Sequence, residues 1–60
     1  MDHMNCKQIE VQLKDGKLPK IFIKSNLHLE DNILHVEDEL YNVTYCFPME
    51  NVLYYQFKRE

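Results

Sequence analysis

Two histidines are the residues of this sequence whose types and spacing most directly suggest chemistry. His28 and His35 stand at equal distances on either side of Asp31-Asn32, a dipeptide suited to a two-residue hairpin turn. Such a turn places the two imidazoles opposite each other, with Cβ atoms about 4.5–5.5 Å apart. With the carboxylate of Glu30 or Glu37 they could bind Zn²⁺, and as imidazolium ions they would repel each other at low pH. Histidines on a solvated strand face usually do neither, so we expect no metal site, with His28 and His35 as weak candidates.

The two cysteines, Cys6 and Cys46, are predicted to be free thiols. They form no CxxC motif, and two cysteines do not make the dense disulfide framework of a small secreted domain. A two-residue turn at Asp38-Glu39 would place His35 opposite Asn42, which leaves Cys46 about 13 Å further along the strand. A site that combines His35 with Cys46 is therefore not expected.

A second pattern places basic residues around an aromatic one. Lys20, Phe22 and Lys24 alternate along the chain, and Lys14 lies nearby. Lysines in this arrangement can follow a phosphate backbone while the ring stacks on a base. However, the pattern has one aromatic residue and no arginine, and exposed strand lysines also prevent edge-to-edge aggregation. Nucleic-acid binding through Lys14, Lys20, Phe22 and Lys24 is therefore an alternative that we do not favour.

A third pattern is a surplus of apolar residues on the face expected to be exposed. A small monomeric domain has no need of this surplus, and contiguous apolar patches mark contacts. We therefore predict an interface for self-association or for a protein partner, made of Leu18, Phe22, Ile33, Leu40, Val52 and Tyr54.

Signals for catalysis are weak. Gly16 is the only glycine, which excludes a glycine-rich phosphate-binding loop. Ser25 and Thr44 are the only residues of their types, and neither cysteine has a predicted histidine partner. We expect a protein that is not an enzyme and that binds no cofactor.

Alternating apolar and polar residues predict the strands that carry these groups. Residues 8–14 alternate and form the first strand, which ends before Asp15 and a hairpin turn. A three-residue turn pairs Ile9 with Ile23, whereas a two-residue turn pairs Ile9 with Phe22. We prefer the three-residue turn because it places aliphatic residues opposite each other on one face.

The two later turns predict the same inner face. The Asp31-Asn32 turn pairs Leu29 with Leu34, and a two-residue turn at Asp38-Glu39 pairs Leu34 with Val43. Pro48 predicts a type I turn or a single 3₁₀ turn before the last strand. The residues expected to face inward are Ile21, Ile23, Leu27 and Leu29 in the second strand, Leu34 and Val36 in the third, Tyr41, Val43, Tyr45 and Phe47 in the fourth, and Leu53, Tyr55 and Phe57 in the last.

The predicted fold is all-β, with about five antiparallel strands in meander order. The 60 residues contain no alanine or tryptophan but many β-branched and aromatic residues, and 45% are hydrophobic. A long bent second strand and a short turn before the last strand resemble small SH3-like or Sm-like barrels, with a strongly twisted sheet as the alternative. We assign residues 6–58 to one small domain. Residues 1–5 are treated as an N-terminal tail, part of which could derive from an expression vector because Met4 offers a second start.

The charge distribution argues against a generally basic binding protein. The net charge is −3, and no lysine or arginine occurs between Leu27 and Phe57. No run of apolar residues is long enough to span a membrane, so we expect a cytoplasmic protein without membrane partners. The predicted function is a small non-enzymatic interaction or regulatory module that forms a homo-oligomer through strand edges and apolar outer residues. The alternatives are the nucleic-acid binder and a metal- or pH-responsive site at His28 and His35.

Overall fold

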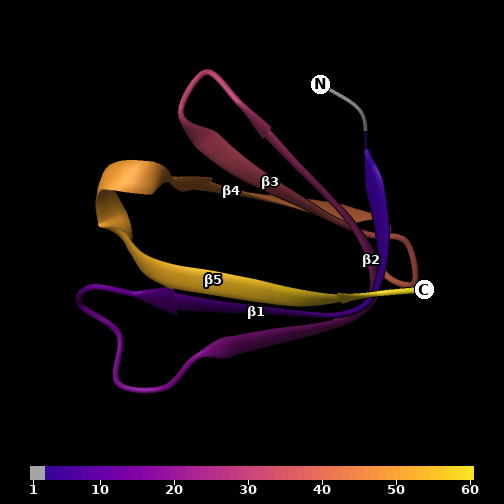
Figure 1. The fold of residues 1–60 in the computed structure, drawn as a ribbon, viewed down its shortest axis with the longest axis horizontal. Coiled ribbons are helices and arrows are strands. Elements are labelled where there is room, and N and C mark those ends of the chain that lie inside the picture. Colours follow the sequence, from indigo (N-terminus) through magenta and orange to yellow (C-terminus); the bar gives the residue numbers. More distant parts are fainter. Residues whose placement is uncertain (1–2) are drawn as a thin grey trace.

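The computed structural model describes residues 3–60, which form one antiparallel sheet. Its elements are β1 (Met4–Leu13), β2 (Lys20–Glu30), β3 (Ile33–Asp38), β4 (Val43–Pro48), the 3₁₀ helix η1 (Met49–Asn51) and β5 (Val52–Arg59). The prediction of an all-β fold with five antiparallel strands is confirmed. The sheet coils strongly, but β4 and β5 remain as its two edges and it does not close into a barrel (Figure 1).

The predicted meander order holds from β1 to β4, but the last strand lies beside β1 and not beside β4. The strands are ordered β4-β3-β2-β1-β5. Pro48 precedes η1, and this turn carries the chain across the open end of the coiled sheet to the free edge of β1 (Figure 1). Two backbone hydrogen bonds hold the crossing: Met49 N donates to Asn32 O at 3.0 Å, and Lys14 N donates to Asn51 O at 2.9 Å. The residues around Pro48 predicted the turn, but they did not predict that β5 pairs with β1.

Strands β1 and β2 both bend in the middle, which folds the sheet over itself (Figure 1). The pairs Ile9↔Phe22 and Cys6↔Ser25 are both buried, although they lie three positions apart along each strand. Side chains that point to one face of a flat strand lie two positions apart, so the inner face changes between these pairs. Lys24 lies at the bend, with a φ of 50°.

Because of this bend, the register preferred for the first hairpin, which pairs Ile9 with Ile23, is wrong. Ile9 pairs with Phe22, and Phe22 is buried, whereas Ile21 and Ile23 are exposed. The connecting loop covers residues 14–19 and is longer than a tight turn. The buried side chain of Gln12 holds it to the end of β1, since its Nε2 donates to the backbone oxygens of Leu13, the last residue of β1, and of Gly16 in the loop, each at 2.9 Å.

The second hairpin forms as predicted, and the third connection is longer than predicted. Asp31 and Asn32 have φ values of 53° and 60°, as a type I′ turn requires, and Leu29 pairs with Leu34. The connection from β3 to β4 has four residues instead of two, so Leu34 pairs with Phe47 and not with Val43. The longer connection shifts the partner of Leu34 by an even number of residues. The side chains of β4 therefore keep their faces, and Phe47 faces inward as expected.

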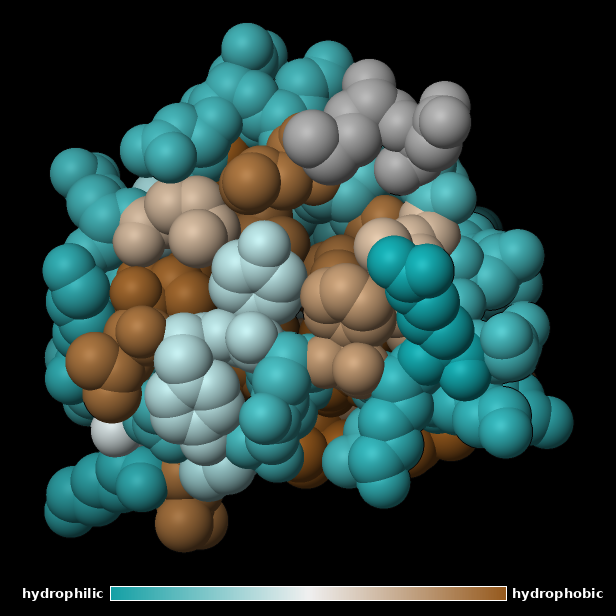
Figure 2. All heavy atoms as spheres, viewed as in Figure 1, coloured by the Kyte–Doolittle hydropathy of each residue, from teal (hydrophilic) through white to brown (hydrophobic). Residues whose placement is uncertain are grey.

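The core lies between the two layers of the folded sheet. It consists of Cys6, Ile9, Val11, Phe22, Leu27, Leu34, Val36, Phe47 and Val52. Strand β4 contributes only Phe47, because Val43 and Tyr45, which were expected to face inward, are exposed. Tyr41, also expected to face inward, lies in the connection before β4 and is exposed. Leu53 is also exposed, while Tyr55 and Phe57 pack against the core. Hydrophobic side chains consequently reach the surface between hydrophilic ones (Figure 2).

Strand β1 begins at Met4, which pairs with Leu27. Residues 4 and 5 therefore belong to the sheet, although the sequence placed them in the N-terminal tail. Residues 1 and 2 of that tail lie outside the described part of the chain.

Candidate functional site

The residues of the predicted interface fall into two groups. Leu18, Leu40 and Tyr54 are exposed and Ile33 is half-buried, but Phe22 and Val52 are buried and are removed from the surface. Phe22 points inward because β2 bends after it. Val52 points inward because the pairing of β1 with β5 shifts by one residue between Gln12 and Leu13. A shift of this kind turns the following side chains to the opposite face.

Exposed apolar residues instead gather on edge strand β4 and the connection before it. Leu40 and Tyr41 are 79% and 72% exposed, and Val43 and Tyr45 are exposed by 41% and 38%. Among residues 3–60, the other side of β4 pairs with no strand, since β4 is the outermost strand of the sheet. This surface was not predicted, because three of these residues, Tyr41, Val43 and Tyr45, were expected to lie in the core. The absence of any charged residue from Val43 to Pro48 is the signal that could have revealed it.

The basic pattern of the first hairpin loses its aromatic residue. Lys14, Lys20 and Lys24 are exposed. The ring of Phe22, however, packs against those of Tyr45 and Phe47, with centroids 5.0 Å and 6.2 Å apart. Phe22 therefore has no free face on which a nucleic-acid base could stack.

The histidines form a stack of three rings on the outer face of the sheet. His28 pairs with His35 across the β2–β3 ladder, as predicted, and their rings are parallel with centroids 4.4 Å apart. His3 stacks on the other side of His28, with centroids 4.3 Å apart. His28 lies in the middle of this stack, and its side chain is 12% exposed.

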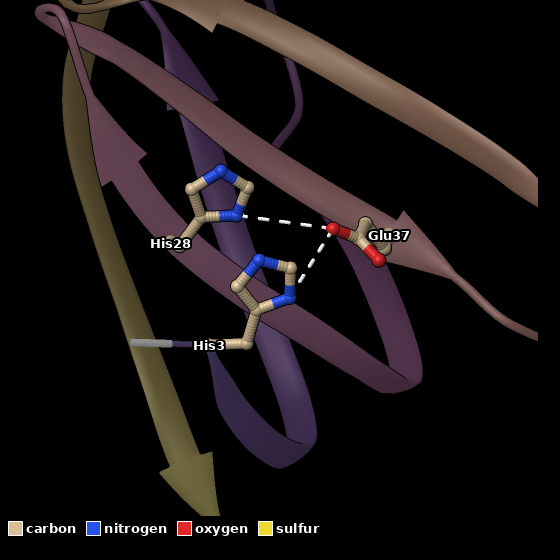
Figure 3. Close-up of side chains that lie close together, drawn as sticks. All are labelled: His3, His28 and Glu37. Atoms are coloured by element: carbon tan, nitrogen blue, oxygen red, sulfur yellow. Dashed lines mark ion pairs between the residues drawn. The ribbon is translucent and has the colours of Figure 1, made fainter. Parts of the chain in front are cut away.

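Glu37 of β3 points toward this stack (Figure 3). Its Oε1 lies 3.4 Å from Nδ1 of His3 and 3.9 Å from Nδ1 of His28. One potential ligand atom from each of the three residues lies within 4.8 Å of the other two. Nδ1 of His28 is buried and has no hydrogen-bond partner among residues 3–60. Leaving such an atom unpaired in a protein costs about 1–3 kcal/mol.

His3 was missed because the sequence analysis set the first residues aside. The signal was nevertheless present in the rejected register of the first hairpin. In that register Met4 pairs with Leu27, so the preceding residue, His3, comes to lie beside His28.

Cys46 lies opposite His35, which corrects the expectation that the two are far apart. The four-residue connection after Asp38 brings Cys46 into register with His35, and its Sγ lies 3.5 Å from Nδ1 of His35. The row His3, His28, His35 and Cys46 thus runs across the sheet toward the edge at β4. Both cysteines are free, as predicted. Burial raises the pKa of the Cys6 thiol, although Arg59 opposes this effect.

The hollows described in the surface are small. A hollow of about 130 Å³ lies beside His28. One of about 220 Å³ is lined by β1 and β5, and one of about 240 Å³ is lined mainly by the start of β1 and the middle of β2. Typical pockets for small organic ligands measure about 300–1,000 Å³. The histidine stack and the β4 edge are therefore the features to which a function can be assigned.

The comparisons with known proteins provide no family for the chain. No protein-family model matches it, and no curated protein or solved structure matches it significantly. Among residues 3–60, no helix combines the length and the apolar character that crossing a membrane would require.

Proposed function

We propose that the chain is a small non-enzymatic interaction module that self-associates by pairing strand β4 of one copy with β4 of another. The observation that carries this proposal is that β4, an edge strand of the sheet, contains no charged residue. Strand β4 has a free row of backbone groups, and it presents Val43 and Tyr45 at the surface without a charged residue from Val43 to Pro48. Natural sheets usually protect such edges with charges, and an unprotected edge is a template for another strand.

The other edge of the sheet is better protected. Strand β5 carries Lys58 and Arg59 near its end. On the same strand, the hydroxyl of Tyr54 donates to Oε2 of Glu10 at 2.7 Å, which keeps this ring on its own sheet and raises the pKa of Tyr54. The difference between the two edges favours β4 as the contact strand.

An antiparallel pairing of two β4 strands is symmetric and closes as a dimer. Each copy then satisfies the edge of the other, and Leu40 and Tyr41 beside the strand add apolar contact area. A seam of six residues per copy is short, so the dimer is expected to be weak and dependent on concentration. A weak contact of this kind suits a regulatory module, because its occupancy changes with protein level.

The arrangement of strands supports a further proposal about the fold. Strand β1 lies between β2 and β5, and a 3₁₀ turn precedes β5, so the sheet resembles an open variant of the SH3-like barrel. The two free thiols agree with a reducing compartment such as the cytoplasm, where we place the protein.

Sedimentation analysis over a concentration series up to the high micromolar range tests the self-association. The wild-type chain should shift from monomer to dimer. Val43→Lys should weaken the dimer at least about tenfold because it brings two charges to the seam, while the new lysine remains opposite Asp38 within its own chain. Leu53→Lys is the matched control, since it places the same charge on the exposed part of β5. A strict monomer, or a control that dissociates as readily as Val43→Lys, would contradict the proposal.

A further inference from the structure

We propose that His3, His28 and Glu37 bind one divalent transition-metal ion of the Zn²⁺ type. This site is separate from the proposed dimer seam, because it lies on the β1–β3 part of the sheet and uses no residue of β4. It also differs from the pair considered in the sequence, since His35 belongs to the stack but not to the ligand set.

The positions of the three donor atoms support the assignment. Zn²⁺ bonds to imidazole nitrogen and carboxylate oxygen at about 2.0–2.2 Å, which places neighbouring donors of a tetrahedral site about 3.3–3.5 Å apart. The distance from Nδ1 of His3 to Oε1 of Glu37 is already 3.4 Å, and that from Nδ1 of His28 to the same oxygen is 3.9 Å. Both outer ligands can adjust, because the side chains of His3 and Glu37 are 51% and 33% exposed.

The unpaired nitrogen of His28 is the second, independent observation. Its Nδ1 is buried, faces Glu37 and has no hydrogen-bond partner within the described part of the chain (Figure 3). The ring of His35 on one side holds the imidazole in its plane. The ring of His3 is parallel to that of His28 with centroids 4.3 Å apart, so it must tilt out of the stack to direct its Nδ1 at the same ion. A metal ion at this position would satisfy the nitrogen, and Glu30, 3.9 Å from Nε2, would orient the ring from its other nitrogen. Carboxylates in this outer position are common around metal-binding histidines.

The charge of the surroundings favours a cation. Glu30 and Glu37 flank the stack, and no lysine or arginine occurs anywhere from Leu27 to Phe57. Two imidazoles with one carboxylate suit Zn²⁺, Co²⁺, Ni²⁺ or Cu²⁺ better than Mg²⁺ or Ca²⁺, which prefer sites made of oxygen alone. Three protein ligands leave one tetrahedral position for water. In its number of protein ligands the site therefore resembles zinc sites that keep one coordination position open.

Calorimetric titration of the full chain with zinc chloride at neutral pH tests the site. We expect one ion per chain, and affinity at least about tenfold lower in both His3→Ala and Glu37→Gln, whose mutated side chains are partly exposed. Glu50→Gln, on η1, is the matched carboxylate control and should retain the affinity within about threefold. Circular dichroism of each variant verifies the fold, and His3→Ala alone suffices if Glu37→Gln fails to fold.

Several results would overturn the assignment. These are the absence of saturable binding, equal affinity of the wild type and His3→Ala, or a loss in Glu50→Gln as large as that in Glu37→Gln.

Titration with Co²⁺ distinguishes a neighbouring site. We expect the visible absorption of a four-coordinate ion without a sulfur-to-metal band. A sulfur band that disappears in Cys46→Ser would place the ion at His35 and Cys46 instead, and would likewise refute the proposal. The same titration of Val43→Lys should give the wild-type affinity, so the metal site can stand or fall independently of the dimer.

Discussion

Replacing Phe22 with leucine tests the bend of β2, on which the folded shape of the sheet depends. Phe22 is 8% exposed, and its ring contacts those of Tyr45 and Phe47 with centroids 5.0 Å and 6.2 Å away. Each aromatic pair contributes about 0.5–1.5 kcal/mol beyond the area it buries. Leucine retains most of the apolar volume, so losing two such contacts should lower the free energy of unfolding by about 1–3 kcal/mol.

The matched variant is Ile23→Thr, one position along the same strand. Ile23 is 57% exposed, so its replacement by another β-branched residue should change the free energy of unfolding by about 0.5 kcal/mol or less. Urea unfolding followed by circular dichroism measures both variants. A chain of this length is expected to have a stability of about 3–9 kcal/mol, so both effects are measurable. If Ile23→Thr proves more destabilising than Phe22→Leu, the side chain that fills the core is Ile23, and the bend at Lys24 is refuted.

Two further predictions concern the thiols. A thiol reagent should modify the exposed Cys46 in the native protein but should modify Cys6, which is 1% exposed, only after unfolding. Mass spectrometry distinguishes the two modified cysteines. Equal rates of modification in the native protein would contradict the burial of Cys6. Burial also raises the pKa of Cys6 above its usual value of 9.0, so the folded chain holds this proton more tightly than the unfolded chain. The resulting stability is fully present below pH 9.0 and falls as the pH rises through that value toward the pKa of the folded state. Unfolding experiments at increasing alkaline pH should therefore show a smaller loss for Cys6→Ala than for the wild type, and equal losses would contradict the shift.

The two proposals use different parts of the same half of the sheet. The metal ligands lie on its outer face, whereas the β4 seam is a row of backbone groups at its edge. His35 lies between them, because it stacks on His28 and its Nδ1 lies 3.5 Å from Sγ of Cys46. Comparing zinc affinity in the wild type and in the monomeric Val43→Lys variant therefore measures directly whether the two features influence each other.

Local patterns in the sequence determined the centre of the fold and one of the two ring contacts in the histidine stack. The alternation around Asp31-Asn32 and the preference of these two residues for positive φ specify a type I′ turn. That turn fixes the pairing of Leu29 with Leu34, and therefore also that of His28 with His35. A two-residue turn leaves no freedom of register, so residues that are close in sequence suffice to predict these contacts.

The tertiary structure alone decided the contacts that depend on long connections. The six-residue loop before β2 and the four-residue loop before β4 each permit several registers, and the choice follows from the packing of Phe22 and Phe47 in a common core. The position of β5 depends on the free edge of β1 at the far side of the sheet. The bend at Lys24 ends the simple alternation that the sequence analysis assumed throughout β2. His3 reaches His28 and Cys46 reaches His35 as a consequence of these registers, because contacts between distant segments depend on the energy of the whole core and not on any local turn.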